Sequence, residues 1–342
     1  MVFVSEKRFL RYGGISLKKL RKLVTETMKT YLGLDFGGTK LLIGEHDRDG
    51  RLLRSKRYET GARSQEQAVN ILFESLGDYK KTVGFEGKLS GAGVGIVGVV
   101  DHNEGLWLSI NHVVTDPPVP LAAMIEDKLG VPAAIDNDVR CTTMAELIFG
   151  HGKKSKNFIY LNVGTGLAAG FVIDGRILRG ANNNSGEIGH MVTDIESKHI
   201  CVCGRQGCAE NVVSGIGFAQ NAQRLAPFYK TSLCVPSEGS GIDVKEIFRL
   251  ADEGDPLCLE LTGQAVATLA CVIMNVVRVT DPDMLILGGG IVSDGWLMGK
   301  INKFLNPAAV RGLKNGIVLS GFEPKRAGLA GATALAMTAS GL

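Results

Sequence analysis

One short segment holds a set of groups that together could bind phosphate, and it reads Asp35-Phe36-Gly37-Gly38-Thr39-Lys40. The two glycines let backbone N–H groups approach an anion with no Cβ in the way. The threonine adds a hydroxyl, the lysine adds a positive charge, and the aspartate could orient the water shell of a magnesium ion. A Walker loop is excluded, because the order is Gly-Thr-Lys rather than Gly-Lys-Thr and a strand is predicted to follow. A plain hairpin turn is the alternative reading.

Two more glycine turns could hold other parts of a nucleotide. Gly164-Thr165-Gly166 follows the apolar run 158–163, so it could grip a polyphosphate from the opposite side. Gly288-Gly289-Gly290 follows the apolar run 284–287 and is suited to a base and ribose lying against bare backbone. Together the three turns predict a site for a nucleoside polyphosphate.

A fourth glycine cluster imitates a dinucleotide-binding motif. Residues 93–98 read Gly-Val-Gly-Ile-Val-Gly, which fits the spacing of that motif. However, the segment lies inside an apolar strand pattern, and the nearest following acid, Asp101, comes too early for the ribose-binding position. We therefore expect these glycines to serve packing.

The segment Asp136-Asn137-Asp138 lies between a predicted strand that ends at residue 135 and a predicted helix over 139–149. Phosphoryl transfer needs positioning, charge neutralisation and a base aimed at the attacking hydroxyl. A carboxylate of this segment could serve as such a base, and Asp136 is expected to be solvated or structural. The alternative role for Asp138 is that of an ordinary helix N-cap, the position where we expect its backbone to lie.

Three of the seven cysteines are clustered, as Cys201, Cys203 and Cys208. Three thiolates with one histidine suit a closed, four-coordinate zinc site, which has a structural rather than a catalytic role. His190 and His199 are both near enough in sequence to be the fourth ligand. Buried or reactive free thiols are the alternative.

The pattern of strands and turns occurs twice along the chain. Strands are predicted at 31–35, 41–45 and 52–58, and again at 158–163, 167–173 and around residue 177. Each set has a glycine turn and then an Asp-Gly turn, and segments with helical periodicity follow both sets. A duplicated three-stranded meander predicts two similar α/β domains that face each other.

The composition is that of an ordinary globular protein, with 342 residues, 45% hydrophobic residues and a net charge of +3. Residues 1–29 carry a net +6, including a predicted basic helix over 15–28, which leaves −3 for the rest of the chain. The body therefore has no broad basic surface for nucleic acid. The apolar run 265–279 is too short to span a bilayer and is expected to be a buried helix. We expect no membrane partner and a cytoplasmic location.

Taken together and in this order, these motifs resemble the ROK family of sugar kinases and sugar-responsive repressors over about residues 30–340. The resemblance also rests on Gly186-Glu187-Ile188-Gly189-His190 and on Glu210, which follows the cysteine cluster. It implies a two-domain actin-like (ribonuclease H-like) fold with the active site in the interdomain cleft. The implied division is a basic extension (1–29), a smaller domain (30–135 plus about 326–342) and a larger domain with the zinc loop (136–325).

The resemblance also assigns roles to residues. It implies a structural zinc held by His190, Cys201, Cys203 and Cys208. It implies that Asp138 is the catalytic base, because Asp136-Asn137-Asp138 matches the catalytic segment of the family. It also implies a ring of sugar-binding groups formed by Asn111, Asn137, Asp138, Glu187, His190 and Glu210. ATP with Mg²⁺ is the expected phosphoryl donor, the acceptor is a hydroxyl of a hexose, and a homodimer or homotetramer is expected.

Two departures from the family pattern bear on the sugar. Arg140 stands where the family usually has Asn, and Ile110 stands where it usually has Pro. Arg140 could favour an acidic or N-acylated sugar, or it could face away from the site. The expected function is an ATP-dependent hexokinase acting on the 6-hydroxyl of glucose, and an N-acetylhexosamine kinase is the alternative. Alternatives of another class are a sugar-responsive transcriptional regulator and a non-catalytic sugar sensor.

Overall fold

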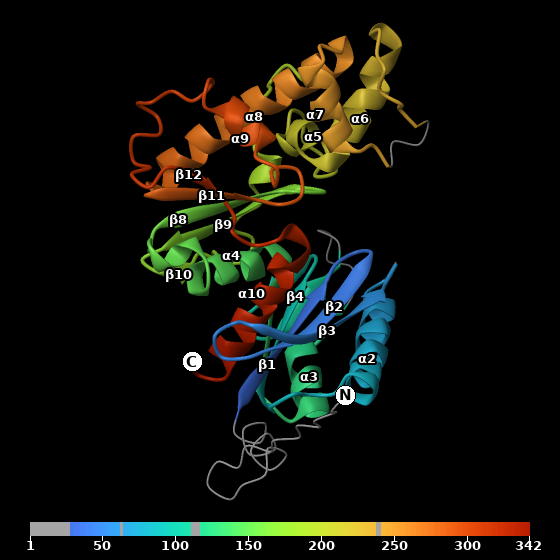
Figure 1. Ribbon diagram of the computed structural model, residues 1–342, viewed down its shortest axis with the longest axis vertical. Coiled ribbons are helices and arrows are strands. Elements are labelled where there is room, and N and C mark those ends of the chain that lie inside the picture. The colour runs from blue at the N-terminus through green and yellow to red at the C-terminus, as the bar shows by residue number, and fades with distance from the viewer. Residues whose placement is uncertain (1–27, 62–63, 111–116, 237–240) are drawn as a thin grey trace, which may run out of the picture.

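The structure is a computed structural model that describes residues 28–61, 64–110, 117–236 and 241–342 (Figure 1). The predicted basic helix before residue 28 and the sugar-binding candidate Asn111 lie outside these ranges. In the described residues two five-stranded mixed sheets form the centres of two lobes.

The first sheet has the strand order β3-β2-β1-β4-β7. Its strands are β1 (Lys29–Phe36), β2 (Lys40–His46), β3 (Leu52–Glu59), β4 (Lys88–Ile96) and β7 (Ala133–Asn137). β1, β2 and β3 form the predicted antiparallel meander, whereas β4 and β7 join it in parallel.

The second sheet repeats this plan with the order β10-β9-β8-β11-β12. Its strands are β8 (Phe158–Val163), β9 (Leu167–Ile173), β10 (Arg176–Ile177), β11 (Met284–Gly288) and β12 (Ile317–Leu319). Again the first three strands are antiparallel, and the last two are added in parallel. The duplication predicted from the sequence is therefore confirmed.

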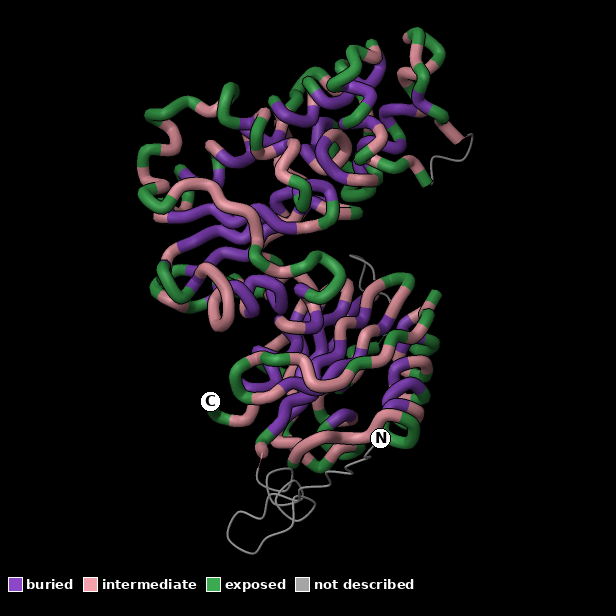
Figure 2. Tube along the Cα trace, viewed as in Figure 1, coloured by how far each residue is buried: buried purple, intermediate pink, exposed green. Residues whose placement is uncertain are grey.

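Each sheet has its own apolar core, and Figure 2 shows buried residues in both lobes. The first core lies around β1, β4, α2 (Gln65–Thr82) and α3 (Leu121–Leu129). Helix α2 begins where Ser64 caps it by accepting a hydrogen bond from Gln67 N. A small hairpin of β5 (Val99–Asp101) and β6 (Leu106–Ser109) follows β4, because the apolar strand pattern around residues 93–98 is interrupted at Gly98, which has a positive φ.

The second core lies under helices that the sequence analysis largely left undescribed. They are α5 (Glu210–Val213), α6 (Gly215–Leu225), α7 (Val244–Asp252), α8 (Pro256–Thr280) and α9 (Trp296–Ile301). By length and composition α8 could cross a membrane, but its apolar residues Leu261, Leu269 and Ile273 are buried in this core. The prediction of a buried core helix is confirmed.

Helices α4 (Asp138–Ile148) and α10 (Pro324–Ala339) lie between the two sheets (Figure 1). Helix α10 packs on the first sheet, and α4 contacts both α10 and β9 of the second sheet. The contact is close because a Cβ on Gly93 of β4 would overlap the carbonyl oxygen of Ala332 in α10. Of the glycines that imitate a dinucleotide motif, Gly93 and Gly95 thus serve helix packing, whereas Gly98 lies against the carbonyl oxygen of Ser109 in β6.

We propose that 30–135 plus about 326–342 and 136–325 are the two domains, as the sequence resemblance implies. The return of α10 to the first sheet supports this division. Helix α10 begins at Pro324, two residues before the proposed boundary.

Candidate functional site

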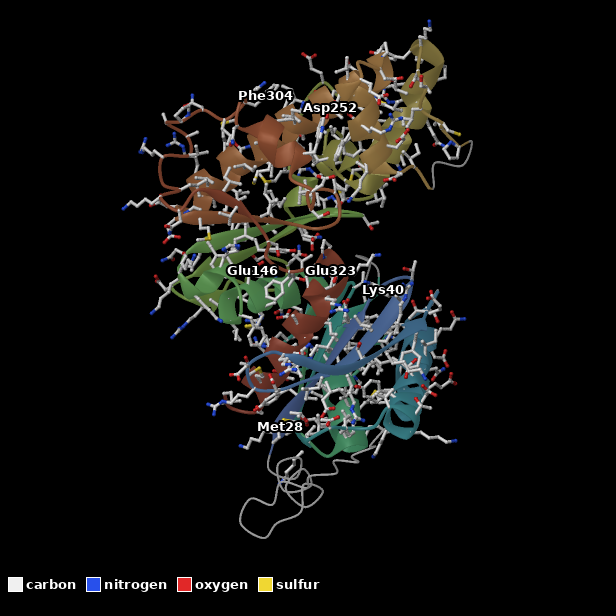
Figure 3. All side chains as sticks on the ribbon, viewed as in Figure 1. Met28, Lys40, Glu146, Asp252, Phe304 and Glu323 are labelled. Atoms are coloured by element: carbon white, nitrogen blue, oxygen red, sulfur yellow. The ribbon has the colours of Figure 1, made fainter. Side chains whose placement is uncertain are left out.

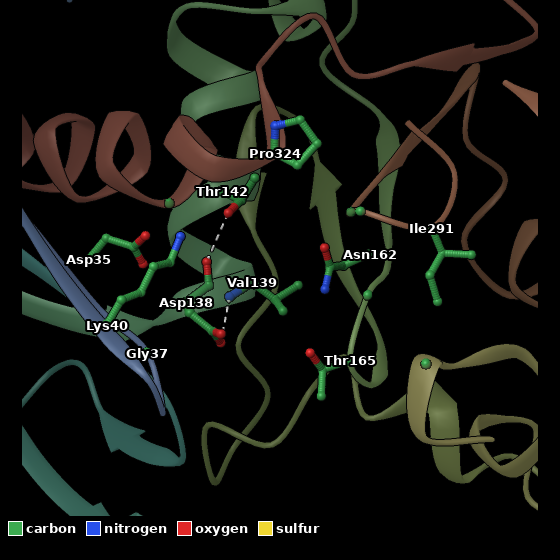
Figure 4. A pocket seen from close by; sticks show the side chains of 15 residues that line it. Asp35, Gly37, Lys40, Asp138, Val139, Thr142, Asn162, Thr165, Ile291 and Pro324 are labelled. Atoms are coloured by element: carbon green, nitrogen blue, oxygen red, sulfur yellow. Dashed lines mark hydrogen bonds between the residues drawn. The ribbon is translucent and has the colours of Figure 1, made fainter. Parts of the chain in front are cut away.

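A cleft with a cavity volume of ≈ 470 Å³ opens between the two lobes (Figure 4). It is formed by β1 and β2 of the first sheet, the start of α4, and glycine turns of the second sheet. Its lining residues are Asp35, Gly37, Lys40, Asp138, Val139, Thr142, Asn162, Gly164, Thr165, Gly215, Gly289, Gly290, Ile291, Pro324 and Gly328. Eight of the residues proposed for ATP binding or catalysis therefore line one cavity.

The turn between β1 and β2 forms one wall of this cleft. It is closed by a hydrogen bond of 2.9 Å from Gly37 N to the carbonyl oxygen of Lys40. Lys40 is the first residue of β2 and lies at the end of the first sheet that is nearest the second sheet (Figure 3). Gly38 and Thr39 form the exposed tip of the turn and are not among the lining residues.

Asp35 lies near the carboxyl end of β1, beside the N-terminal part of α10. A Cβ on Gly328 of α10 would come within 2.5 Å of Oδ1 of Asp35. Burial raises the pKa of Asp35 to about 6, while the charge of Lys40 opposes this shift and that of Asp138 adds to it. In Figure 4 the Lys40 side chain lies between the carboxylates of Asp35 and Asp138.

Sheet register explains why two carboxylates distant in the sequence meet. β1, β4 and β7 are parallel, with Asp35 paired to Gly95 and Gly95 paired to Asp136. The carboxyl ends of these strands therefore lie at one edge of the sheet, where ligand sites of α/β proteins commonly form. Asp138 follows β7 directly and enters the cleft at the start of α4.

The N-cap of α4 is Asn137, not Asp138 as expected. The Asn137 side-chain oxygen accepts from Val139 N at 3.0 Å and from Arg140 N at 3.4 Å, and its amide donates to the carbonyl oxygen of Gly98. Asp138 is the first helical residue, and its Oδ1 accepts from Val139 N at 2.9 Å. Burial, with the charge of Glu187 adding to it, raises the pKa of Asp138.

The residues of the turn between β8 and β9 make two different kinds of contact. Gly164 and Thr165 line the cleft, whereas Gly166 lies against Glu210. Oε2 of Glu210 accepts a hydrogen bond of 2.9 Å from Leu167 N. This contact fixes one carboxylate oxygen at the base of the turn.

The glycines at the end of β11 and after it also make two different kinds of contact. Gly289 and Gly290 line the cleft. Gly288 instead packs on the ring of Tyr160, because a Cβ at residue 288 would overlap that side chain.

Glu187 and His190 belong to the 3-10 turn around Ile188–His190. The charge of Glu187 contributes to the raised pKa of Asp138, so the two carboxylates are close enough to interact. Neither Glu187, His190, Glu210 nor Asn137 lines the cavity described above. Of the proposed sugar-binding groups in the described residues, only Asp138 lines this cavity, whereas Glu210 lies against Gly166 of the second glycine turn.

Four potential metal ligands converge beside this turn. The ligand atoms of His190, Cys201, Cys203 and Cys208 all lie within 4.8 Å of one another. Cys203 Sγ and Cys208 Sγ are 3.6 Å apart, and Cys201 Sγ and His190 Nδ1 are 3.5 Å apart. Two ligands of a tetrahedral zinc ion with bonds of about 2.0–2.3 Å are roughly 3.5–3.8 Å apart, so the group fits that ion. His190, rather than His199, is the histidine of this cluster.

Asp136 and Arg140, at the end of β7 and the start of α4, form a buried ion pair. Arg140 Nε donates to Asp136 Oδ1 at 2.7 Å, and the two side chains are only 5% and 2% exposed. Arg140 also donates to the carbonyl oxygen of Asn183 at 2.9 Å. Arg140 is not among the residues that line the cavity.

Several lining residues were missed in the sequence analysis. Thr142 lies one helical turn after Asp138, a spacing that could have identified it. Asn162 is a polar residue near the end of an apolar strand, which is also a usable signal. Ile291, Pro324 and Gly328 have no local signal, because tertiary packing alone brings them to the cleft.

Comparison with known proteins places these features in a family. The ROK family matches residues 31–339. The chain is 28% identical over 273 residues to a glucokinase of Halalkalibacterium halodurans, a match that covers 78% of this chain and 81% of the relative. It is 29% identical over 270 residues to an N-acetyl-D-glucosamine kinase of Salmonella gallinarum, which covers 76% and 84%.

Solved structures agree with the sequence comparison. A ROK family transcriptional regulator, a homologue of the Escherichia coli MLC protein, superposes with a TM-score of 0.78 at 26% identity, covering 92% of this chain and 79% of the regulator. A ROK family glucokinase from Streptomyces griseus, solved with glucose and AMPPNP, superposes with a TM-score of 0.69 at 25% identity, covering 90% and 99%. The chain belongs to the ROK family, has its two-domain actin-like fold, and is similar in sequence to glucokinases and N-acetylglucosamine kinases.

Proposed function

We propose that this protein is an ATP-dependent hexokinase that transfers the γ-phosphoryl group to the 6-hydroxyl of a hexose, with glucose as the first candidate. One observation carries the proposal. Asp138 and glycine turns from both sheets line a single cleft, as phosphoryl transfer between two bound substrates requires. The similarity to glucokinases supports glucose.

Asp138 is the proposed catalytic base. It would accept the proton of the attacking hydroxyl as the new bond from sugar oxygen to γ-phosphorus forms and the bond from γ-phosphorus to the β,γ-bridging oxygen breaks. Its raised pKa suits this role, because a base is most effective when its pKa lies near the working pH. The hydrogen bond from Val139 N holds the carboxylate of Asp138 at the N-terminal end of α4.

The glycine turns and Lys40 are the proposed ATP-binding groups. The set comprises Asp35, Gly37, Gly38, Thr39, Lys40, Gly164, Thr165, Gly166, Gly288, Gly289 and Gly290. Lys40 would neutralise phosphate charge, and Asp35 would hold the water shell of the magnesium ion that accompanies ATP. Magnesium supplies neutralisation of the charge that develops on the transferring group. Four residues of this set do not line the cavity, so we expect them to contribute less to ATP binding. They are Gly38, Thr39, Gly166 and Gly288.

The sugar is proposed to bind beside Asp138. A hexose offers many hydroxyls, so its site needs carboxylates and amides that accept or donate at each one. The proposed groups are Asn111, Asn137, Asp138, Glu187, His190 and Glu210. The interaction between Glu187 and Asp138 supports this grouping.

The cysteine cluster is proposed to hold a structural zinc ion. Four protein ligands leave no open position for a reacting water, so the ion would hold the loop between Glu187 and Glu210 in place. A cytoplasmic location and a homodimer or homotetramer remain parts of the proposal.

Two specific observations favour alternative functions. The 29% identity to an N-acetyl-D-glucosamine kinase favours an N-acetylhexosamine substrate. The similarity to a ROK transcriptional regulator favours a sugar-responsive regulator or a non-catalytic sensor. Asp138, which lies in the cleft beside Lys40, favours catalysis over sensing.

The deciding experiment is ADP release with MgATP, measured against glucose, mannose, fructose, allose, N-acetylglucosamine and N-acetylmannosamine. Turnover on one of these sugars would establish the kinase and identify its substrate. A sugar that raises the melting temperature without any turnover would favour the sensor, and retention on DNA at moderate salt would then test the regulator.

A further inference from the structure

Asp136 is the centre of a charge cluster in which its own side chain and that of Arg140 are buried. Its Oδ1 accepts from Arg140 Nε at 2.7 Å, and its Oδ2 accepts from Arg179 Nε at 3.0 Å and Nη2 at 2.8 Å. His102 Nδ1 lies 3.7 Å from the same Oδ2 and 2.9 Å from the carbonyl oxygen of Ile135. One carboxylate thus holds two guanidinium groups in fixed directions.

The cluster joins the two lobes. Asp136 lies in β7 of the first sheet, whereas Arg179 follows β10 of the second sheet. A buried ion pair is weak evidence for added stability, because desolvation of the charges offsets most of their attraction. Its position between the two sheets points instead to a role in fixing geometry. The two hydrogen bonds from Arg179 to Asp136 fix both the distance between these side chains and their relative orientation.

The same arginines hold the start and the middle of the loop that leads to Glu187. Arg179 begins this loop, and its carbonyl oxygen accepts from Ser185 N at 3.1 Å. Arg140 holds the middle of the loop by donating to the carbonyl oxygen of Asn183, a residue with φ of 53°. Glu187 follows four residues after Asn183 in the sequence. Its distance from Asp138 therefore depends on where the two arginines place the loop.

We propose that Asp136, Arg140 and Arg179 are positioning residues that set Glu187 relative to Asp138 and thereby set sugar affinity. This inference rests on the proposed sugar site. None of its three residues lines the cavity formed by the glycine turns, so we expect the cluster to act on sugar binding. Sugar binding should consequently depend on the cluster, and MgATP binding should not.

The test compares Arg179→Met and Arg179→Lys with Arg176→Met, a control on an exposed arginine of β10. We expect Arg179→Met to raise the KM and the Kd for the sugar about tenfold or more, with the KM for MgATP within about twofold of wild type. Arg179→Lys keeps the charge but loses the two-pronged contact, so it should give an intermediate rise. It also provides a folded variant if Arg179→Met does not fold.

Amide hydrogen exchange of residues 181–190 gives a readout that needs no sugar. Exchange should rise about tenfold or more in Arg179→Met and remain unchanged in the control. Unchanged exchange, or equal losses in the sugar and MgATP parameters, would overturn the proposal. So would faster exchange with an unchanged KM and Kd for the sugar. If wild type neither binds nor phosphorylates a sugar, the proposed function fails and the sugar-setting role fails with it, whereas the exchange result still decides whether the cluster holds the loop.

Discussion

Gly328 of α10 lies so close to Asp35 that a Cβ at residue 328 would come within 2.5 Å of the aspartate Oδ1. This single contact joins the helix that lies between the lobes to the carboxylate proposed to hold magnesium. It makes the position of Asp35 sensitive to a change made almost three hundred residues away in the sequence.

Gly328→Ala should therefore weaken MgATP binding. The added methyl group must displace the Asp35 carboxylate or the helix, and we expect the KM for MgATP to rise about tenfold, with less effect on the KM for the sugar. Steady-state kinetics with each substrate varied in turn checks this. Gly77→Ala is the matched control, because Gly77 is also helical but a Cβ there meets nothing within 4 Å. An unchanged KM in both variants would show that Asp35 is not needed at its present position.

Asp35→Asn should increase stability at neutral pH while it removes MgATP binding. Burial raises the pKa of Asp35 to about 6, so the folded state holds this proton more tightly than the unfolded state does. The stabilisation from the proton is complete below about pH 4 and is lost as pH rises through about 6. Urea unfolding at pH 7 should therefore find the variant more stable by about 1–2 kcal/mol, a difference that disappears toward pH 4.

MgATP binding should release a proton from the same group near pH 6. A magnesium ion and its water shell favour the ionised carboxylate, so its pKa should fall on binding. Calorimetric titrations in two buffers of different ionisation enthalpy would measure the release, and Asp35→Asn should abolish it. Equal apparent enthalpies in both buffers for the wild type would contradict the assignment.

Asp138→Asn should retain sugar binding but lose at least about a hundredfold in kcat, because an amide cannot take up the hydroxyl proton. In the wild type, the raised pKa of Asp138 predicts that kcat/KM falls as pH decreases, at a pH above the usual titration range of an aspartate. The control is Asp127→Asn, on the exposed face of α3. Near-normal turnover by Asp138→Asn would refute the role of base.

One zinc ion per chain is expected in the purified protein. Cys203→Ser should release the ion and raise the KM for the sugar about tenfold or more, because the loop between Glu187 and Glu210 loses its anchor. Cys234→Ser is a suitable control, since Cys234 is also exposed but lies outside the cluster. Metal analysis by mass spectrometry, together with sugar kinetics, decides the outcome. A full zinc content in Cys203→Ser would contradict the four-ligand site.

Local patterns explain why much of the fold was predictable. The two meanders depend on strand periodicity and on Gly-Thr and Asp-Gly turns, all of which lie within a few neighbouring residues. The N-cap of α4 was assigned wrongly because Asp, Asn and Asp at 136–138 are all good caps. The choice depends on where β7 stops pairing with β4, and that pairing ends at Asn137.

Tertiary contacts explain what could not be predicted. Arg179 reaches Asp136 from the other sheet, and Arg140 reaches the carbonyl oxygen of Asn183. No spacing within the sequence encodes these two contacts. The role of Gly93 depends likewise on Ala332, which only the folded chain brings close. The sequence could therefore identify the chemical groups of the site more readily than the orientation of their side chains in the fold.

The return of α10 to the first sheet also has a consequence for synthesis. A ribosome makes β1 to β7 early, but the helix that covers this sheet comes after the whole second sheet. Until α10 emerges from the ribosome, the face of the first sheet around Gly93 is not covered by this helix and can form non-native contacts. The lobe that is translated first is thus completed last, and a nascent chain stalled before residue 324 should depend on chaperones although its second sheet is already made.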